Sequence, residues 1–99
     1  MAEFQPPVRT VRAVITGRVQ GVCFRAWTVQ EATARGLTGW VRNRSDGSVE
    51  ALFHGPTRSV NAMLDACWQG PPSARVDEVT ADNVHETPGF AGFRQYPTV

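Results

Sequence analysis

The sequence predicts an α+β domain in which two helices pack on one face of an antiparallel sheet. Three observations lead to this fold class. The 99 residues provide for one hydrophobic core, strand-like and helix-like periodicities follow one another in the order βαββαβ, and both helical segments need a second layer to bury their apolar residues. A split βαβ sandwich is the compact arrangement that does so. This architecture hosts many unrelated functions, so function must come from particular residues.

Composition limits the classes of function. The formal net charge of +1 does not indicate a nucleic-acid or membrane partner. No apolar run approaches the roughly 20 residues of a membrane span, and the start has no signal-peptide pattern. Cys23 and Cys67 have neither metal-ligand spacing nor the density of a disulfide scaffold, which predicts free thiols and a cytoplasmic location. Residues 1–7 carry two prolines and are expected to be a flexible leader to a domain spanning 8–99.

The first strand and helix are predicted from periodicity. Apolar and polar residues alternate over 11–16, as in a half-buried strand, and glycines bracket a loop over 17–21. Residues 24–35 have helical composition. Val29, Ala32 and Gly36 fall on one stripe of this helix, and Gly36 is a natural stop.

A hairpin is expected next, with arms over 39–43 and 48–54. A two-residue Asp46-Gly47 turn would place Val41 opposite Leu52. A type I turn with Gly47 in a left-handed bulge would instead place Arg42 opposite Glu50 and gather the small apolar residues on one face. We expect the bulged turn.

The second helix has the clearest pattern in the chain. Pro56 suits a first helical position, and Gly70 with the two prolines after it ends the segment. One continuous apolar stripe is formed by Val60, Met63, Leu64, Cys67 and Trp68. A strand over 75–84 follows, with a bulge indicated between Val76 and Val79, and then a short strand over 93–96.

The loop between the first strand and the first helix carries the candidate chemistry. A loop that opens into a helix points free N–H groups outward at the positive end of the helix dipole, which suits an anion. Arg25 adds a planar cation that matches two phosphate oxygens. A crossover through the first helix makes the first two strands parallel, so Asn43 at the end of the second strand lies near that loop, on the helix-facing side.

The residues missing from this loop indicate the substrate. It contains no His, Asp or Glu, no acidic cluster suggests a magnesium site, and His54 is expected at the far edge of the sheet. Phosphoryl transfer depends on placement and charge stabilisation. Without a general acid the leaving group must depart unprotonated, as a carboxylate with a pKa of about 4 can. The residues therefore favour acyl phosphates over alkyl phosphates.

The segments GRVQGVCFR (17–25), GLTGWVRN (36–43) and DGSVE (46–50) closely resemble the acylphosphatase family, and the resemblance extends from Val11 to Tyr96. It implies a ferredoxin-like fold and a metal-free hydrolase without cofactor that splits a small acyl phosphate into a carboxylate and phosphate. It also implies that Arg25 holds the phosphate, that Asn43 orients the attacking water, and that the substrate's own phosphate takes the proton. The phosphate-binding backbone would be that of Gln20, Gly21, Val22, Cys23 and Phe24. One departure is the ending Tyr96-Pro97-Thr98-Val99, where relatives commonly have basic or aromatic residues.

Three alternative functions follow from parts of the same pattern. A cysteine phosphatase needs five residues between its cysteine and arginine, whereas Cys23 and Arg25 are separated by one. An RNA-binding module would use Trp40 on the open sheet face, but Glu50 is expected there too and the chain is nearly neutral. A catalytically silent phosphate-binding module can be excluded only by measuring turnover. We expect a monomer that binds no nucleic acid or membrane.

Overall fold

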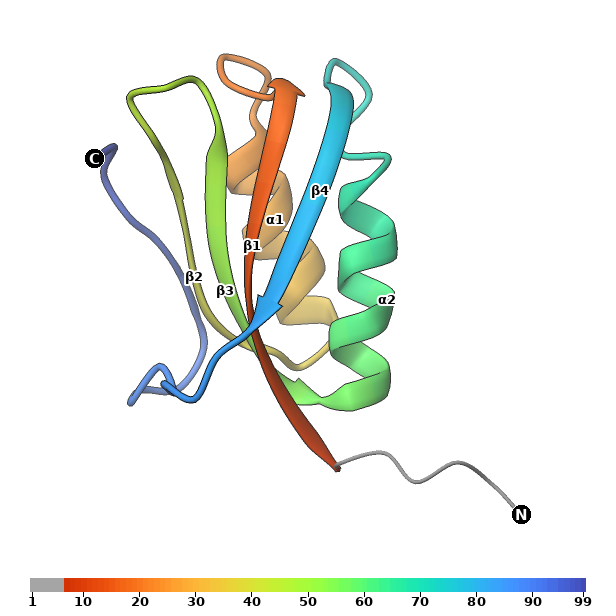
Figure 1. Ribbon diagram of the computed structural model, residues 1–99, viewed down its shortest axis with the longest axis vertical. Coiled ribbons are helices and arrows are strands. Elements are labelled where there is room, and N and C mark those ends of the chain that lie inside the picture. Colours follow the sequence, from red (N-terminus) through yellow and green to blue (C-terminus); the bar gives the residue numbers. More distant parts are fainter. Residues whose placement is uncertain (1–6) are drawn as a thin grey trace.

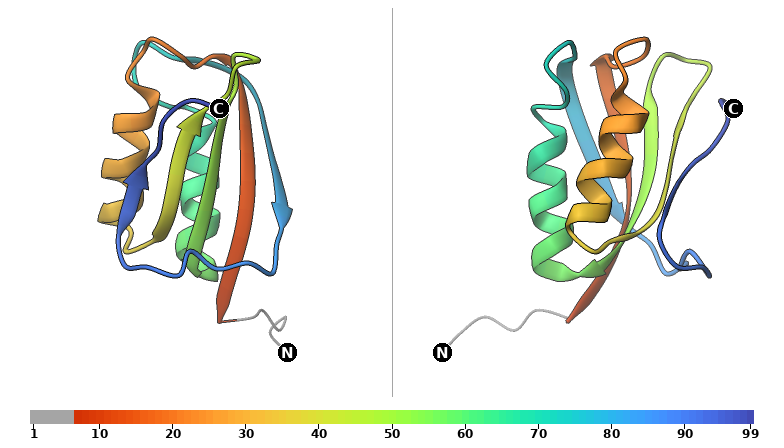
Figure 2. Two further views of the ribbon diagram at one scale, coloured as in Figure 1. Left: turned by 90° about the vertical axis from the view of Figure 1, so that its left-hand side faces the viewer. Right: turned by 180° about the vertical axis from the view of Figure 1, so that it is seen from behind.

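The computed structural model describes residues 7–99, so nearly all of the expected leader lies outside the described residues. The elements are β1 (Val8–Arg18), α1 (Phe24–Ala34), β2 (Thr38–Asn43), β3 (Val49–Pro56), α2 (Thr57–Cys67), β4 (Arg75–Asn83) and β5 (Phe93–Gln95). Both helices cover the same face of one sheet, as predicted (Figures 1 and 2).

The sheet has the strand order β4-β1-β3-β2-β5 and is mixed. The first four strands are antiparallel to their neighbours, whereas β5 pairs parallel to β2. The reason is the position at which β4 finishes. β4 stops at the end of the sheet where β2 starts, so the chain passes across that end and enters β5 in the same direction as β2 (Figure 1). The predicted α+β fold with a short extra terminal strand is confirmed, and the direction of that strand, which the sequence left open, is parallel to β2.

The hairpin between β2 and β3 has the predicted bulged turn. Arg42 pairs with Glu50 and Asn43 with Val49. Gly47 has a φ of 95°, and its N–H donates to the carbonyl of Arg44 at 3.1 Å. Asp46 Oδ1 accepts hydrogen bonds from the hydroxyl and the N–H of Ser48, and these bonds lower the pKa of the Asp46 carboxyl. Local turn chemistry therefore sets the register that places Asn43 on the helix side.

The edges of β1 and β4 differ slightly from the predicted bounds. β1 continues through Gly17 and Arg18, which were expected in a loop. The bulge in β4 is confirmed: Thr16 pairs with Glu78 and Gly17 with Val76, which leaves Asp77 as the extra residue. A Cβ at Gly17 would lie 2.2 Å from the carbonyl oxygen of Arg75. Only glycine allows the two strands to approach so closely here.

The core lies between the sheet and the two helices, where alternate residues of the central strands point at the helix stripes. Each fully buried aliphatic side chain contributes about 1.5–3 kcal/mol. The core residues with the least exposure include Val11, Ala13, Val41, Val49, Ala51, Phe53, Ala32, Val60, Met63 and Cys67. The expected packing roles of the small apolar residues in β2 and β3 are confirmed.

The buried face of α1 was predicted only in part, since Ala32 is buried as expected but Gly36 is not. Phe24, Thr28 and Ala32 face the core, whereas Val29 is half-buried and Gly36 is exposed. Phe24 is a core residue that contacts Trp27, with ring centroids 5.3 Å apart. Thr28 can lie on this face because its hydroxyl donates to the carbonyl of Phe24 at 2.8 Å. The face is thus rotated toward residues that the apolar pattern did not select.

Two details of α2 also differ from the prediction. Pro56 has an extended ψ of 137° and precedes the helix, which begins at Thr57. Trp68 follows the last helical residue and is 50% exposed, so it extends beyond the region that the core can cover. The buried part of the stripe is Val60, Met63 and Cys67.

Candidate functional site

Four chain segments surround a hollow of about 390 Å³ at one end of the sheet. They are the loop after β1, the first turn of α1, the end of β2 and the end of β5. In Figure 1 this loop and the β2–β3 turn lie at the same end of the sheet. The lining residues are Val19, Gln20, Gly21, Cys23, Phe24, Arg25, Ala26, Asn43 and Gln95.

The loop and the helix start contain two residues in the left-handed backbone conformation. Gly21 has a φ of 74°, and Cys23, just before α1, has φ 64° and ψ 27°. A left-handed conformation at a residue with a side chain costs about 1 kcal/mol and is typical of functional sites. Among the described residues no side chain caps α1, and the first turn of this helix contains no acidic residue. The first N–H groups of the helix have no intrahelical partner, so this end favours an anion.

Gln20 joins this loop to the β2–β3 turn. Its Nε2 donates to the carbonyl of Arg44 at 2.7 Å and to the carbonyl of Ser48 at 2.9 Å. These two bonds link the loop before α1 to the β2–β3 turn, which begins at Arg44, directly after Asn43. Sequence reasoning assigned only the backbone of Gln20 to the site and missed its side chain, because an amide that spans two distant loops has no local signature.

Arg25 is half-buried and lines the hollow from α1. Its Nη1 donates to the carbonyl of Tyr96 at 3.3 Å. Within residues 7–99 no carboxylate lies at ion-pair distance from Arg25, in contrast to Arg12, Arg35, Arg42 and Arg44. Its positive charge is therefore oriented by a neutral acceptor and is free to bind an anionic ligand.

Asn43 ends β2 and lines the same hollow. Its Oδ1 is buried and has no hydrogen-bond partner among residues 7–99. Leaving a buried acceptor unpaired costs about 1–3 kcal/mol, and such an atom calls for a functional explanation. The position of Asn43 beside the loop agrees with the argument from strand direction.

The remaining predicted residues are placed as follows. The side chains of Val22 and Phe24 point into the core, so only their backbones can contribute to a site. His54 lies at the far end of its strand, where its Nδ1 is 2.6 Å from the hydroxyl of Thr10. Gln95 was not anticipated, because the sequence did not show which edge the last strand would join. Residues 7–99 contain no cluster of three or more His, Cys, Asp or Glu that could hold a metal ion.

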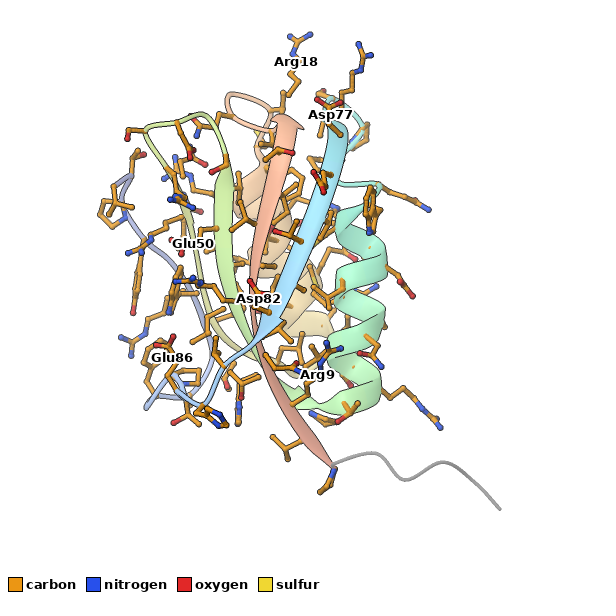
Figure 3. The ribbon with its side chains drawn as sticks, viewed as in Figure 1. Arg9, Arg18, Glu50, Asp77, Asp82 and Glu86 are labelled. Carbon is orange, nitrogen blue, oxygen red and sulfur yellow. The ribbon has the colours of Figure 1, made fainter. Side chains whose placement is uncertain are left out.

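The open face of the sheet does not present a free aromatic surface at Trp40. Tyr96 stacks on Trp40 with ring centroids 5.8 Å apart, and the guanidinium carbon of Arg42 lies 4.6 Å from the centroid of the Trp40 ring. Glu50 is on this face as expected, 5% exposed and paired with Arg42 (Figure 3). The aromatic stacking required by the RNA-binding alternative is thus already made within the chain.

Comparison with known proteins decides the family. The sequence model of the acylphosphatase family matches residues 11–95. The chain belongs to the acylphosphatase family. It is 54% identical over 92 residues to the acylphosphatase of Rhodospirillum rubrum, covering 93% of this chain and 100% of the relative. It is 58% identical over 80 residues to that of Rhizobium meliloti, covering 81% and 84%. An acylphosphatase structure from Coxiella burnetii superposes with a TM-score of 0.86 at 32% identity, covering 90% and 93%.

These relatives confirm the predicted activity and fold. The chain has acylphosphatase activity, the hydrolysis of an acyl phosphate to a carboxylate and inorganic phosphate. The ferredoxin-like α+β fold expected of an acylphosphatase is also the observed one. None of the helices described here has the length and apolar character to cross a membrane.

Proposed function

We propose that this acylphosphatase performs hydrolysis with groups from its own chain: the backbone of residues 20–24 and Arg25 hold the phosphate, and Asn43 positions the attacking water. The observation that carries the proposal is the unpartnered Oδ1 of Asn43, buried at the hollow that Arg25 also lines. An acceptor at this position can take a hydrogen bond from a water molecule. The bond would direct a lone pair of the water oxygen toward the phosphorus of a phosphate held by the loop.

The chemistry then proceeds without a side-chain base. The water oxygen forms a bond to phosphorus while the bond between phosphorus and the acyl oxygen breaks. One proton of the water passes to an oxygen of the substrate's phosphate, and the carboxylate leaves unprotonated. Arg25 and the N–H groups stabilise the charge on the equatorial oxygens, which is the main demand of phosphoryl transfer.

The proposal includes independence from metals and cofactors. The described residues that line the hollow carry no carboxylate or imidazole, so the lining resembles an anion site more than a magnesium site. We further propose a cytoplasmic monomer that binds no nucleic acid. The two free thiols support that location, and the occupied face of Trp40 supports the absence of RNA binding.

Substitutions at two residues test the separate roles. Arg25→Ala should weaken competitive inhibition by inorganic phosphate and also reduce kcat, because Arg25 holds the phosphate in both ground and transition states. Arg25→Lys should restore little, since an ammonium cannot present two parallel donors. Asn43→Ala should reduce kcat about a thousandfold, roughly 4 kcal/mol of transition-state stabilisation, and leave phosphate inhibition nearly unchanged.

Arg18→Ala is the matched control. Arg18 is exposed and extends beyond the end of β1, next to the loop but not into the hollow (Figure 3). Arg18→Ala should leave kcat and the inhibition constant for phosphate within about twofold of the unmodified protein, as expected for an exposed charge. If Asn43→Ala stays folded and phosphate inhibition weakens as much as kcat falls, Asn43 is a phosphate ligand and the water-positioning role is wrong.

A further inference from the structure

The segment that follows β5 contacts both residues to which we assign catalytic roles. Residues 96–99 continue beside β2 toward the β2–β3 turn, as the two views of Figure 2 show. The N–H of Tyr96 donates to the carbonyl of Val41 at 2.8 Å, and the N–H of Val99 donates to the carbonyl of Asn43 at 3.1 Å. Ser45 completes the row by donating its N–H to the carbonyl of Val99 at 2.7 Å.

On its other side the segment faces α1. The carbonyl of Tyr96 accepts the hydrogen bond from Arg25 at 3.3 Å. Arg25 and Asn43 come from different elements, and residues 96–99 make a direct bond to each. A neutral carbonyl orients the guanidinium without cancelling its charge, so the cation remains available for a phosphate.

The segment is held by an anchor on the open face of the sheet. The Tyr96 ring stacks on Trp40 at an interplanar angle of 16°. Arg42 covers Trp40 from its own position in β2, and its Nε bonds to Glu50 Oε1 at 2.8 Å. Aromatic pairs and cation–π contacts of this kind contribute about 0.5–1.5 kcal/mol each. The backbone of Tyr96 is therefore fixed by its ring.

We propose that Tyr96 and Val99 are positioning residues of the acylphosphatase reaction, with Trp40 as the anchor of their segment. Tyr96 orients Arg25 through its carbonyl, and Val99 orients the end of β2 that carries Asn43. This inference rests on the proposed function. A displacement of about 1 Å in a reacting group can lower the rate a hundredfold. The bonds that fix Arg25 and Asn43 therefore affect the rate of catalysis as well as the stability of the fold.

Tyr96→Ala and Tyr96→Phe test the anchor. The alanine variant removes the stacked ring, so Arg25 loses a fixed acceptor; phosphate inhibition should weaken about tenfold and kcat/KM should fall at least as much. The phenylalanine variant retains the ring and should stay within about twofold of the unmodified protein on both constants. The inhibition constant reports only active molecules, so partial unfolding of the alanine variant does not change it.

Val99→Pro and Thr98→Pro test the bond to Asn43. Proline has no N–H, so Val99→Pro removes the donor to the Asn43 carbonyl and should lower kcat about tenfold with phosphate inhibition unchanged. Thr98 is exposed, and its N–H makes no backbone hydrogen bond within the described chain. Thr98→Pro introduces the same ring one residue earlier and should retain nearly full activity.

The outcomes separate this inference from the proposed function. If Arg25→Ala weakens phosphate inhibition but Tyr96→Ala leaves it within twofold, Arg25 keeps its role and Tyr96 is not a positioning residue. If Tyr96→Phe loses as much as Tyr96→Ala, the ring stack is not the anchor. Equal losses in Val99→Pro and Thr98→Pro would overturn the role of Val99. If Arg25→Ala itself leaves phosphate inhibition intact, the proposed function fails first.

Discussion

Replacing Gln20 by alanine should destabilise the protein and disturb catalysis, because both effects depend on the hydrogen bonds of this side chain. The Gln20 side chain donates two hydrogen bonds, to the carbonyls of Arg44 and Ser48. Each such bond contributes about 0.5–1.5 kcal/mol net, so Gln20→Ala should lower the free energy of unfolding by about 2 kcal/mol. For a domain of this length that corresponds to a fall in Tm of about 10 °C.

The kinetic consequence follows from where the bonds end. Arg44 is next to Asn43, so the loss of the tie frees the turn that holds the proposed water-positioning residue. The loop conformation itself depends on the left-handed residues Gly21 and Cys23, which Gln20→Ala does not alter. We expect kcat to fall about tenfold, while competitive inhibition by phosphate changes less than about threefold.

The assay combines thermal unfolding by circular dichroism with hydrolysis of an aromatic acyl phosphate. Gln95→Ala is the matched control, because Gln95 lines the same hollow but makes no side-chain hydrogen bond within residues 7–99. Its Tm should change by less than about 2 °C. If Gln20→Ala melts within the same 2 °C, the two bonds contribute no net stability and the tie between loop and turn is refuted.

Four further results are expected. Activity should survive EDTA without added metal, and loss of turnover that a divalent ion restores would contradict the metal-free mechanism. Cys23→Ser should retain activity within about tenfold, because water and not the thiol attacks; trapping a phosphocysteine by rapid quench would reverse this. Iodoacetamide at pH 8 should label exposed Cys23 and spare Cys67, since burial raises the pKa of the Cys67 thiol to about 12. Gly39→Ala should cost about 3 kcal/mol or more in urea unfolding, because its Cβ would lie 1.8 Å from the carbonyl oxygen of Leu52; Gly36→Ala, with open space around it, should cost only about 1–2 kcal/mol.

Much of the fold could be predicted because the relevant forces are local. The hairpin register follows from Gly47, which tolerates the left-handed conformation of the bulge, and from the charge pair of Arg42 with Glu50. The buried positions of α2 follow from periodicity. The position of Asn43 beside the loop that precedes α1 follows from the direction of the strands on either side of a crossover, and its role in catalysis stays a prediction.

Other features depended on which surfaces met. α1 buries Phe24 and Thr28. Thr28 can be buried because its hydroxyl bonds to the carbonyl of Phe24 within the same helix, so the apolar stripe alone could not identify the buried face. β5 joins parallel to β2 because of the place where β4 ends, which no property of residues 93–95 determines.

By itself the sequence determined the loop that opens into α1, the cation at Arg25, the amide at Asn43 and the kind of substrate they suit. These conclusions need only residue type, short spacing and strand direction. The tertiary structure decided what holds those groups. Gln20 reaches a turn 24 residues away, and Arg25 bonds to a carbonyl 71 residues away. Such contacts form only when the strand order places distant segments at the same end of the sheet, so no local sequence pattern can predict them.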